Sequence, residues 1–296
     1  MESGSVIKGL AYGGFASCVA EVVTMPIDVV KTRMQFSGAH SVQYKGSLDA
    51  ASQILRKEGA QALFKGLKPA LLRQATYGAM RYGLYAPIRN SLGVDPSLPK
   101  SEIPIVKKII AGASAGAVAS FLANPTDLIK IRMQVDGMSG NQAGPRYKGL
   151  FDAFRTIIRE EGVLGLWKGV GPTCGRATVL AAAELASYDE IKQQILDAGL
   201  MREGMPLHFA TSTLAGFIAT GAASPCDVAK SRVMGQPVGP DGKGKLYTGM
   251  FDCLGKTVKS EGVMALWKGF IPNFGRVGPH VIINFVVMEQ LRLYFG

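Results

Sequence analysis

One eight-residue pattern, Pro-x-Asp-x-x-Lys-x-Arg, occurs three times along the chain at almost equal spacing. Its copies begin at Pro26, Pro125 and Pro225, so they lie 99 and 100 residues apart. Each copy is followed, in the same order, by a Tyr-x-Gly step and by a Glu-Gly pair that leads to an aromatic-Lys-Gly segment. Self-similarity at a fixed period is the signature of a repeat architecture, so we predict three copies of one structural unit. The predicted units span residues 1–98, 99–200 and 201–296.

The stretch before each copy of this motif is apolar and rich in glycine. Residues 109–126 contain no Asp, Glu, Lys or Arg over 18 positions, residues 204–226 contain none over 23, and residues 9–27 contain only Glu21. A helix needs about 20 such residues to cross a bilayer. Glycine makes up 37 of the 296 residues, and scattered small residues allow helices to pack closely in lipid. Each repeat is therefore predicted to begin with a transmembrane helix.

The second apolar stretch of each repeat, at residues 71–91, 173–196 and 273–295, carries an arginine in its first half. A charge at that depth of a bilayer is costly unless it faces water or a partner. We therefore predict an all-α membrane protein in which six transmembrane helices, in three pseudo-threefold two-helix repeats, surround a wet interior. Three spans with soluble loops are the alternative, but a mean hydropathy of only +0.17 fits a bundle whose cavity wall is polar.

The charge of the connections predicts the orientation. The connection inside the first repeat is rich in Lys and Arg, whereas the linker at residues 93–103 holds only Lys100 together with Asp95 and Glu102. By the positive-inside tendency, the long connections within the repeats are expected on the inner side of the membrane. Both termini are then expected on the opposite side.

Composition limits the chemistry that the chain can carry out. A net charge of +11 suits a partner that is nucleic acid, anionic lipid or an anionic solute. The four cysteines show no CxxC spacing and the three histidines do not cluster, so we expect no metal site. We also expect no cofactor and no enzyme activity, since the sequence shows no catalytic constellation or nucleotide-binding loop. The first residues lack a cleavable signal or transit pattern, so any targeting information is expected to be internal.

The triplicated motif is similar to the signature of the mitochondrial carrier family, and the resemblance covers essentially the whole chain. Residues 12–21 most resemble brain-type uncoupling-like carriers, whereas residues 276–280 are more similar to dicarboxylate and oxoglutarate carriers. Residues 72–78, 123–130 and 183–189 resemble the branch that holds both groups. The resemblance implies a multi-pass protein of the mitochondrial inner membrane, with a short matrix helix in each repeat, that acts as a monomer.

Proline inside a helix removes a backbone hydrogen bond and kinks the axis, so the three motif prolines are expected to bend three helices inward.

Asp and Lys three positions apart lie on one helix face, and three such faces can close a ring of ion pairs. Ordinary helix-end charges are the alternative. In the family the acid of one repeat pairs with the base of the next, which implies a matrix gate of Asp28–Lys130, Asp127–Lys230 and Asp227–Lys31. Gln35 and Gln134 occupy the positions where the family braces these pairs, and Met234 replaces the third brace.

The second helix of each repeat carries a motif similar to the family's cytoplasmic gate: an aromatic residue, an acid and, three positions after the acid, a base. The second copy matches in full, the third lacks the aromatic residue, and the first has Ala86 in place of the acid. The resemblance implies the pairs Asp189–Arg292 and Glu289–Arg89, and it leaves Lys192 without a partner. The predicted gate residues are Arg89, Tyr188, Asp189, Lys192, Glu289 and Arg292.

Steps of four along the second helices stay on one face and predict a substrate site. Three equivalent arginines lie at the level of the family's substrate contact points, and the resemblance adds Glu21 to the same cavity. Because arginine holds carboxylates bidentately, three at one level are expected to bind a small dianion. Two alternatives stay open: Arg81 as a partner of Glu184 or Glu21, and His280 as a hydrogen-bonded packing residue rather than a proton relay. The predicted substrate-binding residues are Arg73, Arg176, Arg276, Arg81, Tyr77, Glu21, Glu184 and His280.

The Tyr-x-Gly and aromatic-Lys-Gly segments resemble the family's cardiolipin sites, where helix N-termini meet lipid phosphates. Trp167 and Trp267 are interpreted as anchors at the membrane interface. The expected partners are therefore a small anionic substrate, cardiolipin and inner-membrane lipid, and not nucleic acid. The glycines of these segments are Gly46, Gly66, Gly149, Gly169, Gly249 and Gly269.

Three functions compete at this point. The leading hypothesis is the exchange of small dicarboxylates, or of comparable dianions such as phosphate and sulfate, by alternating access. The second is a leak of protons or fatty-acid anions, as in uncoupling proteins. A basic repeat protein that binds nucleic acid is the third, and the long uncharged helices disfavour it. Adenine nucleotides are disfavoured as substrates because Arg176 replaces the small-apolar pair that nucleotide carriers have there.

Overall fold

The structure is a computed structural model that describes residues 2–37, 44–91, 105–136, 138, 146–200, 203–239 and 244–295. Within these residues every repeat has a long helix, a short helix, a short 3-10 helix and a second long helix. The first repeat contains α1 (Glu2–Phe36), α2 (Ser47–Glu58), η2 (Ala60–Phe64) and α3 (Leu67–Ser91). The second contains α4 (Ile105–Val135), α5 (Leu150–Glu161), η3 (Val163–Trp167) and α6 (Val170–Asp197). The third contains α7 (Met205–Gly235), α8 (Met250–Glu261), η4 (Val263–Trp267) and α9 (Phe270–Phe295).

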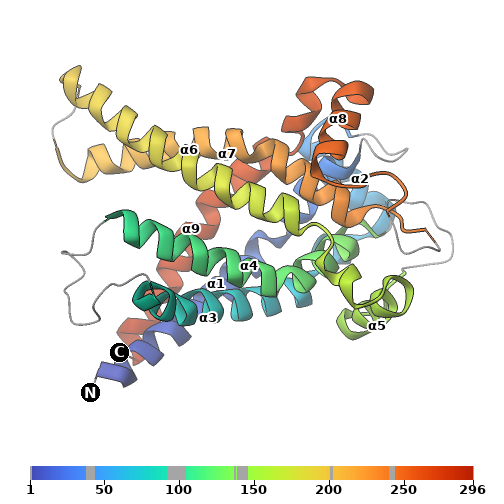
Figure 1. The fold of residues 1–296 in the computed structure, drawn as a ribbon, viewed down its shortest axis with the longest axis horizontal. Coiled ribbons are helices and arrows are strands. Elements are labelled where there is room, and N and C mark those ends of the chain that lie inside the picture. The colour runs from blue at the N-terminus through green and yellow to red at the C-terminus, as the bar shows by residue number, and fades with distance from the viewer. Residues whose placement is uncertain are drawn as a thin grey trace.

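The long helices run side by side and converge toward the end where the short helices α2, α5 and α8 lie (Figure 1). Both chain ends lie at the opposite, more open end (Figure 1). The most extensive packing joins the second helix of one repeat to the first helix of the next: α3 to α4, α6 to α7, and α9 back to α1. The third repeat therefore closes onto the first, and the three repeats form a ring. The linker at residues 93–103, which was used to predict the orientation, lies outside the described residues.

Each first helix continues through its motif proline. Pro26 lies inside α1, Pro125 inside α4 and Pro225 inside α7. A proline has no N–H to donate to the carbonyl four residues earlier, so one backbone oxygen in each of these helices loses its helical partner. These prolines lie toward the converging end of the bundle, directly before the charged positions of the motif.

The glycine of the aromatic-Lys-Gly segment allows each repeat to pack against the next one. Gly66 has a φ of 83° and Gly269 a φ of 81°, which is the left-handed region that side chains rarely adopt. A Cβ atom at Gly66 would lie 3.0 Å from the backbone oxygen of Lys130, and one at Gly269 would lie 3.1 Å from that of Lys31. These glycines therefore bring the loop of one repeat against the gate lysine of another.

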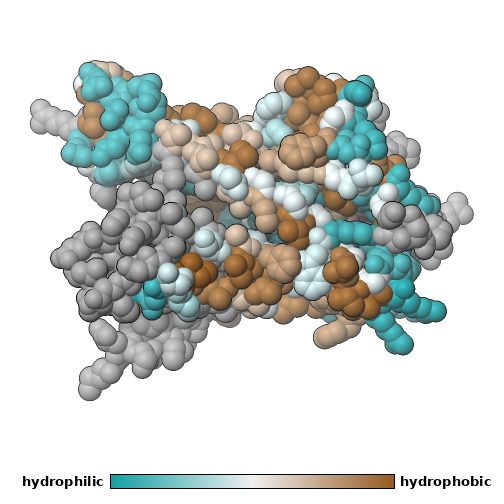
Figure 2. Space-filling model, viewed as in Figure 1, coloured by the Kyte–Doolittle hydropathy of each residue, from teal (hydrophilic) through white to brown (hydrophobic). Residues whose placement is uncertain are grey.

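The side-chain distribution is apolar outside and charged inside. Phe121 on α4, Phe217 on α7 and Phe285 on α9 are exposed, while Asp127 and Asp227 are buried. Figure 2 shows apolar side chains across the middle of the visible face, with hydrophilic side chains at the end near α5 and α8. Apolar side chains gathered on an exposed face mark a surface that contacts lipid or protein.

By length and composition, one of the described helices is apolar enough to cross a membrane, at Tyr12–Phe36. The described residues form no strand beyond an isolated bridge between Val238 and Gly244, so the all-α prediction is confirmed for them. Polar and charged positions on the inner faces lower the hydropathy of helices such as α3, which carries Arg73.

Candidate substrate site and gate

Three buried ion pairs join the first helices of the repeats at the converging end. The family resemblance implies that the aspartate of one repeat pairs with the lysine of the next, and all three pairs are formed in this way. Each pair crosses a repeat boundary, so the ring connects α1, α4 and α7. The pairs are Lys130–Asp28 at 2.9 Å, Lys230–Asp127 at 2.7 Å and Lys31–Asp227 at 3.0 Å.

The two predicted glutamine braces differ in their contacts. Gln134 donates from Nε2 to Asp28 Oδ2 at 2.9 Å and accepts from Thr32 Oγ1 at 2.8 Å, so it braces the first pair as predicted. Gln35 instead accepts from Ser231 Oγ at 2.6 Å and makes no hydrogen bond to an aspartate among the described residues. At the third pair, Asn273 Nδ2 donates at 3.1 Å to the Asp227 oxygen that Lys31 holds, in the place where Gln35 is expected as a brace.

The three predicted substrate arginines contact the gate aspartates directly. Each arginine, from the second helix of one repeat, reaches the aspartate on the first helix of the next. The arginine side chains are 22–35% exposed, whereas those of the gate lysines are 11–15% exposed, so the arginines lie nearer to solvent. Each aspartate is thus shared by one lysine and one arginine. Arg73 forms an ion pair with Asp127, Arg176 Nε lies 2.5 Å from Asp227 Oδ1, and Arg276 Nε lies 3.5 Å from Asp28 Oδ1.

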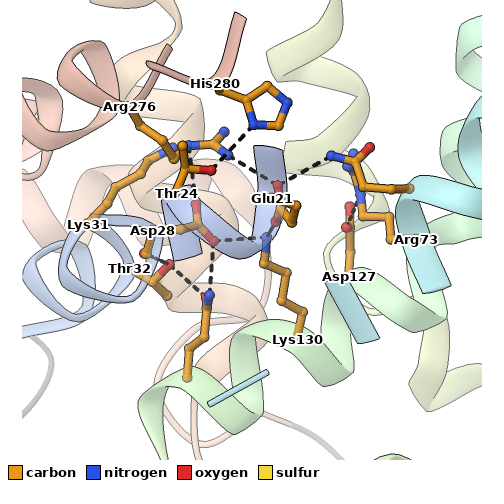
Figure 3. Close-up of polar contacts among 12 residues, drawn as sticks. Glu21, Thr24, Asp28, Lys31, Thr32, Arg73, Asp127, Lys130, Arg276 and His280 are labelled. Carbon is orange, nitrogen blue, oxygen red and sulfur yellow. Dashed lines mark hydrogen bonds and ion pairs between the residues drawn. The ribbon is translucent and has the colours of Figure 1, made fainter. Parts of the chain in front are cut away.

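Glu21 adds a fourth carboxylate that has no counterpart in the other repeats. Figure 3 shows it beside Lys130, whose Nζ lies 2.7 Å from Glu21 Oε1, and Arg276, whose Nη1 lies 3.6 Å from Glu21 Oε2. Gln74 donates to the same carboxylate at 3.3 Å. The equivalent positions in the other repeats are Ser120 and Thr220. With three lysines and three arginines against three aspartates and Glu21, the network has a formal charge of +2.

His280 and Tyr77 line the same region. Thr24 Oγ1 donates to Ala20 O at 2.7 Å, so it is left to accept from His280 Nδ1 at 3.3 Å (Figure 3). His280 is therefore a hydrogen-bonded residue, and its Nε2 atom makes no hydrogen bond within the described part of the chain. Tyr77 lies under the guanidinium of Arg73, with 5.1 Å from Cζ to the ring centroid, a distance suited to a cation–π contact.

Two residues predicted for the site are not joined to this network. Glu184 is exposed and forms no ion pair with any other described side chain. The backbone of Arg81 belongs to α3, but its side chain lies outside the described residues, and its predicted pairing with Glu184 or Glu21 is therefore untested.

At the open end of the bundle, the predicted cytoplasmic gate residues have other partners. Lys192 Nζ lies 2.9 Å from Glu203 Oε1, so Lys192 has a partner before α7 although the gate acid of the first repeat is replaced by Ala86. Tyr188 Oη lies 2.7 Å from His208 Nδ1. Both contacts tie α6 to the third repeat.

Of the two ion pairs predicted at this end, Glu289–Arg89 is not formed, and Asp189–Arg292 lies partly outside the described side chains. Arg89 donates to Asn90 Oδ1 at 3.2 Å, and Glu289 is exposed without an ion pair among the described side chains. Asp189 is also exposed, and the side chain of its predicted partner Arg292 lies outside the described residues. The bundle is therefore closed by ion pairs at the end with the short helices. At the other end, Lys192–Glu203 joins α6 to the residues before α7, and the predicted pair that can be assessed is not formed.

A second set of charged residues joins the short helices to the long helices of the ring by ion pairs. The motif interpretation did not assign a role to these residues. Arg33 on α1 pairs with Glu58 at the end of α2, and its Nε donates to the carbonyl of Gln134 at 2.8 Å in the next repeat. Lys65 holds the same glutamate at 2.8 Å. The sequence contains a pattern that could have predicted these pairs, because the arginine that ends the motif and the glutamate of the Glu-Gly pair both occur in all three repeats. The other two clusters are Arg132, Glu161 and Lys168, and Arg232, Glu261 and Lys268.

These clusters shift the acidity of their carboxyl groups. Burial raises the pKa of Glu58, Glu161 and Glu261, but the hydrogen bonds and charges of their Arg and Lys partners together outweigh it. The pKa of each carboxyl is therefore lowered below its usual value, and the three glutamates stay ionised at neutral pH.

Two of the predicted lipid-binding segments meet at a repeat boundary. A cavity of about 410 Å³ is lined by Lys168 and Gly169 of the second repeat and by Tyr247 and Gly249 of the third. It lies beside the first residues of α6 and α8, whose backbone N–H groups have no partner within the helix and attract anions.

Comparison with known proteins agrees with this architecture. The sequence profile of the mitochondrial carrier protein family matches residues 2–95, 101–199 and 202–296. A Dictyostelium discoideum protein named mitochondrial substrate carrier family protein ucpB is 42% identical over 288 residues, which cover 96% of this chain and 95% of that protein. Mitochondrial uncoupling protein 1 of Arabidopsis thaliana is 42% identical over 296 residues, covering 98% and 94%. The human mitochondrial 2-oxoglutarate/malate carrier protein is 41% identical over 284 residues, covering 95% and 88%.

A ring of three helical repeats, closed at one end by ion pairs and lined with arginines, defines a transporter of the membrane. With the profile matched in all three repeats and relatives above 40% identity over nearly the full chain, the protein belongs to the mitochondrial carrier family. It is therefore a multi-pass protein of the mitochondrial inner membrane.

Proposed function

We propose that the protein spans the inner membrane with six helices and exchanges small dianions by alternating access. The proposed substrates are dicarboxylates or comparable inorganic dianions such as phosphate and sulfate. The observation that carries the proposal is the shared carboxylate: Asp227, for example, is held by Lys31 of the gate and by Arg176 of the site. Substrate binding and gate opening therefore involve the same carboxylate groups.

The charge of the network supports a dianion. The six cations and four carboxylates leave a formal charge of +2, which one dicarboxylate neutralises. The arginines are the more exposed cations, so an anion that enters from the open end meets them before it meets the lysines. Planar guanidinium groups suit carboxylate and phosphate because they offer two parallel N–H donors.

The proposed mechanism follows from competition for the arginines. An anion that binds Arg73, Arg176 and Arg276 removes one cation from each gate aspartate and leaves the lysine as its remaining cationic partner. The ring of three lysine–aspartate pairs is then weaker, and the matrix end can open. A ligand shifts a conformational equilibrium only by its differential affinity for the two states, and here that difference lies in the contacts between arginine and aspartate.

A thermal unfolding screen of the purified protein tests this proposal. Malate, 2-oxoglutarate, phosphate and sulfate are compared with chloride at equal ionic strength. A ligand at about 100 times its Kd stabilises the native state by roughly 2.7 kcal/mol, so a bound dianion raises the unfolding temperature. The rise should disappear in Arg276→Ala, the substitution of the least tightly paired arginine. If no dianion stabilises the wild-type protein more than chloride does, the proposed substrate class is wrong.

The lipid assignments remain part of the same proposal. The cavity between Lys168 and Gly249 presents a lysine and two helix N-termini to a phosphate group, as the predicted cardiolipin sites require. The proposal includes a monomeric carrier, because the ring formed by the three repeats is closed without a second chain.

A leak of protons or fatty-acid anions is the second candidate. Two observations favour it: the 42% identity to a plant uncoupling protein, and the carboxylate of Glu21, which occurs in only one repeat of the network. The two candidates differ in whether transport requires an anion on both sides of the membrane. Exchange of labelled malate and proton flux with fatty acid, measured on the same liposomes, separate them.

A further inference from the structure

Both tryptophans of the chain make the same unusual hydrogen bond. Trp167 donates from its indole Nε1 to the backbone oxygen of Phe121 at 3.1 Å, and Trp267 donates to that of Gly221, also at 3.1 Å. Phe121 lies four residues before Pro125, and Gly221 lies four residues before Pro225. The indole therefore pairs with the carbonyl that the proline leaves without a helical partner.

This bond matters because of where the carbonyl lies. A backbone oxygen without a partner costs several kcal/mol in the apolar part of a membrane. The indole comes from the 3-10 helix that packs against the kinked helix, η3 on α4 and η4 on α7. If the kink changes its angle, the carbonyl turns away from the indole and loses its partner.

The first repeat lacks this bond. Phe64 occupies the equivalent position, and its ring has no N–H to donate, although η2 packs against α1 as the other 3-10 helices pack against theirs. In this repeat, the carbonyl that the proline leaves without a helical partner is that of Val22, four residues before Pro26. No side chain in the described part of the chain donates to it.

We propose that Trp167 and Trp267 are positioning residues that hold the proline kinks of α4 and α7 in the gate-closed geometry. Helix α1 then bends most easily, because Phe64 cannot donate a hydrogen bond to the carbonyl of Val22. The three gate helices are then unequal, and the gate begins to open at α1. This inference rests on the proposed gate at the converging end, but it does not depend on which anion is carried.

The residues that follow the three prolines offer matched reporters of each kink. They are Ile27, Thr126 and Cys226, and Cys226 is a natural thiol with 4% exposure. Single-cysteine proteins carry a thiol at one of these positions, with every other cysteine replaced by alanine. The rate of modification by a water-soluble maleimide is measured in liposomes without substrate, and again with malate.

The tryptophan substitutions are then made in each single-cysteine protein. A typical hydrogen bond contributes a factor of about two to ten to an equilibrium. Trp167→Phe keeps an aromatic ring and should speed modification at position 126 by about that factor, with little change at positions 27 and 226. Trp267→Phe should act in the same way at Cys226 alone, and Phe64→Trp should slow modification at position 27.

The inference is overturned if Trp167→Phe and Trp267→Phe leave all three rates unchanged, or if they raise all three equally, which indicates a general loss of stability. The two tryptophan variants decide the question even if Phe64→Trp does not fold. The wild-type measurement with malate is separate: no response to any dianion contradicts the proposed function, whatever the tryptophan variants show.

Discussion

Arg176 on α6 and Asp227 on α7 form an ion pair in which Nε lies 2.5 Å from Oδ1, and Lys31 on α1 holds the other oxygen of the same carboxylate at 3.0 Å. One aspartate therefore connects all three repeats. The same relationship joins Arg73 to Asp127 and places Arg276 near Asp28. Residues that the sequence assigns separately to a substrate site and to a gate thus form one network, and a change in either set is expected to affect both.

Reversing one gate pair should restore part of the activity that a single reversal removes. Asp127→Lys places a third cation beside Lys230 and Arg73, so the single variant should transport poorly. Adding Lys230→Asp restores the attraction between the two helices. Recovery should stay incomplete because Arg73 still faces a lysine at position 127. Uptake by liposomes that contain each variant measures the effect, and a double variant no better than the single one argues against the pair as a gate element.

Removing the fourth carboxylate should strengthen the binding of dianions. Glu21→Gln raises the formal charge of the network from +2 to +3 and frees Lys130 and Arg276 from a competing anion. The expected result is a several-fold lower Kd for malate in calorimetry on the detergent-solubilised protein. Glu184→Gln is the matched control, since Glu184 lies outside the network and should change the Kd little. An unchanged Kd in Glu21→Gln would mean that this carboxylate does not compete with the substrate.

The contact between Lys192 and Glu203 should hold the cytoplasmic gate open. Ala86→Asp offers Lys192 the partner that the family pattern places there, but Glu203 already binds it at 2.9 Å. Ala86→Asp should therefore shift the resting state more when combined with Glu203→Gln than it does alone. An exposed ion pair is worth about 0–1 kcal/mol, so the shift should be at most about fivefold. Cysteine accessibility from each side of the membrane reports it, and equal shifts with and without Glu203 would contradict the competition.

The fold should lose stability in acid through the glutamates of the short helices. Burial raises the pKa of Glu161, but Arg132 and Lys168 lower it more, so its folded-state pKa lies below the unfolded value of about 4.5. A lowered folded-state pKa gives stability that is present above the unfolded value and is lost as the pH falls through the folded value. Unfolding temperatures of the solubilised protein should therefore fall below about pH 4.5.

Glu161→Gln isolates this contribution. It should lower the free energy of unfolding at pH 7 by about 3 kcal/mol, because Arg132 is left buried without its carboxylate. It should also make the unfolding temperature depend less on pH below about 4.5. Glu160→Gln is the control, because the carboxylate of Glu160 pairs with Arg146 at the surface, where both side chains are nearly half exposed. Similar effects of the two substitutions would show that the buried cluster has no special role.

The repeat and the ring of charges could be predicted from the sequence because both depend on spacing. Three equal motifs define the ring, and Asp and Lys on one helix face allow ion pairs between the repeats. Which aspartate meets which lysine was implied by the resemblance to the carrier family. The contacts of Arg73 and Arg176 with the aspartates could not be predicted in this way. They depend on how far the second helix of one repeat slides along the first helix of the next, and no local pattern records that distance.

Single-position differences between the repeats were the hardest to interpret. Gln35 stands where a brace is expected, but Asn273 from another helix takes its place on Asp227. Lys192 was predicted to lack a partner because its partner Glu203 belongs to the next repeat and lies outside the motif. Trp167 was interpreted as an interface anchor, since the sequence does not show that its indole reaches the carbonyl freed by Pro125.

Counter-exchange in liposomes tests the central claim most directly. Wild-type protein and Arg176→Ala are reconstituted with or without internal malate, and the uptake of labelled malate is measured together with proton flux in the presence of fatty acid. The proposed function predicts uptake that requires internal anion and falls about tenfold or more in Arg176→Ala, as the loss of a charged hydrogen bond implies. Proton flux with fatty acid and no dependence of uptake on internal anion would contradict it and favour the leak.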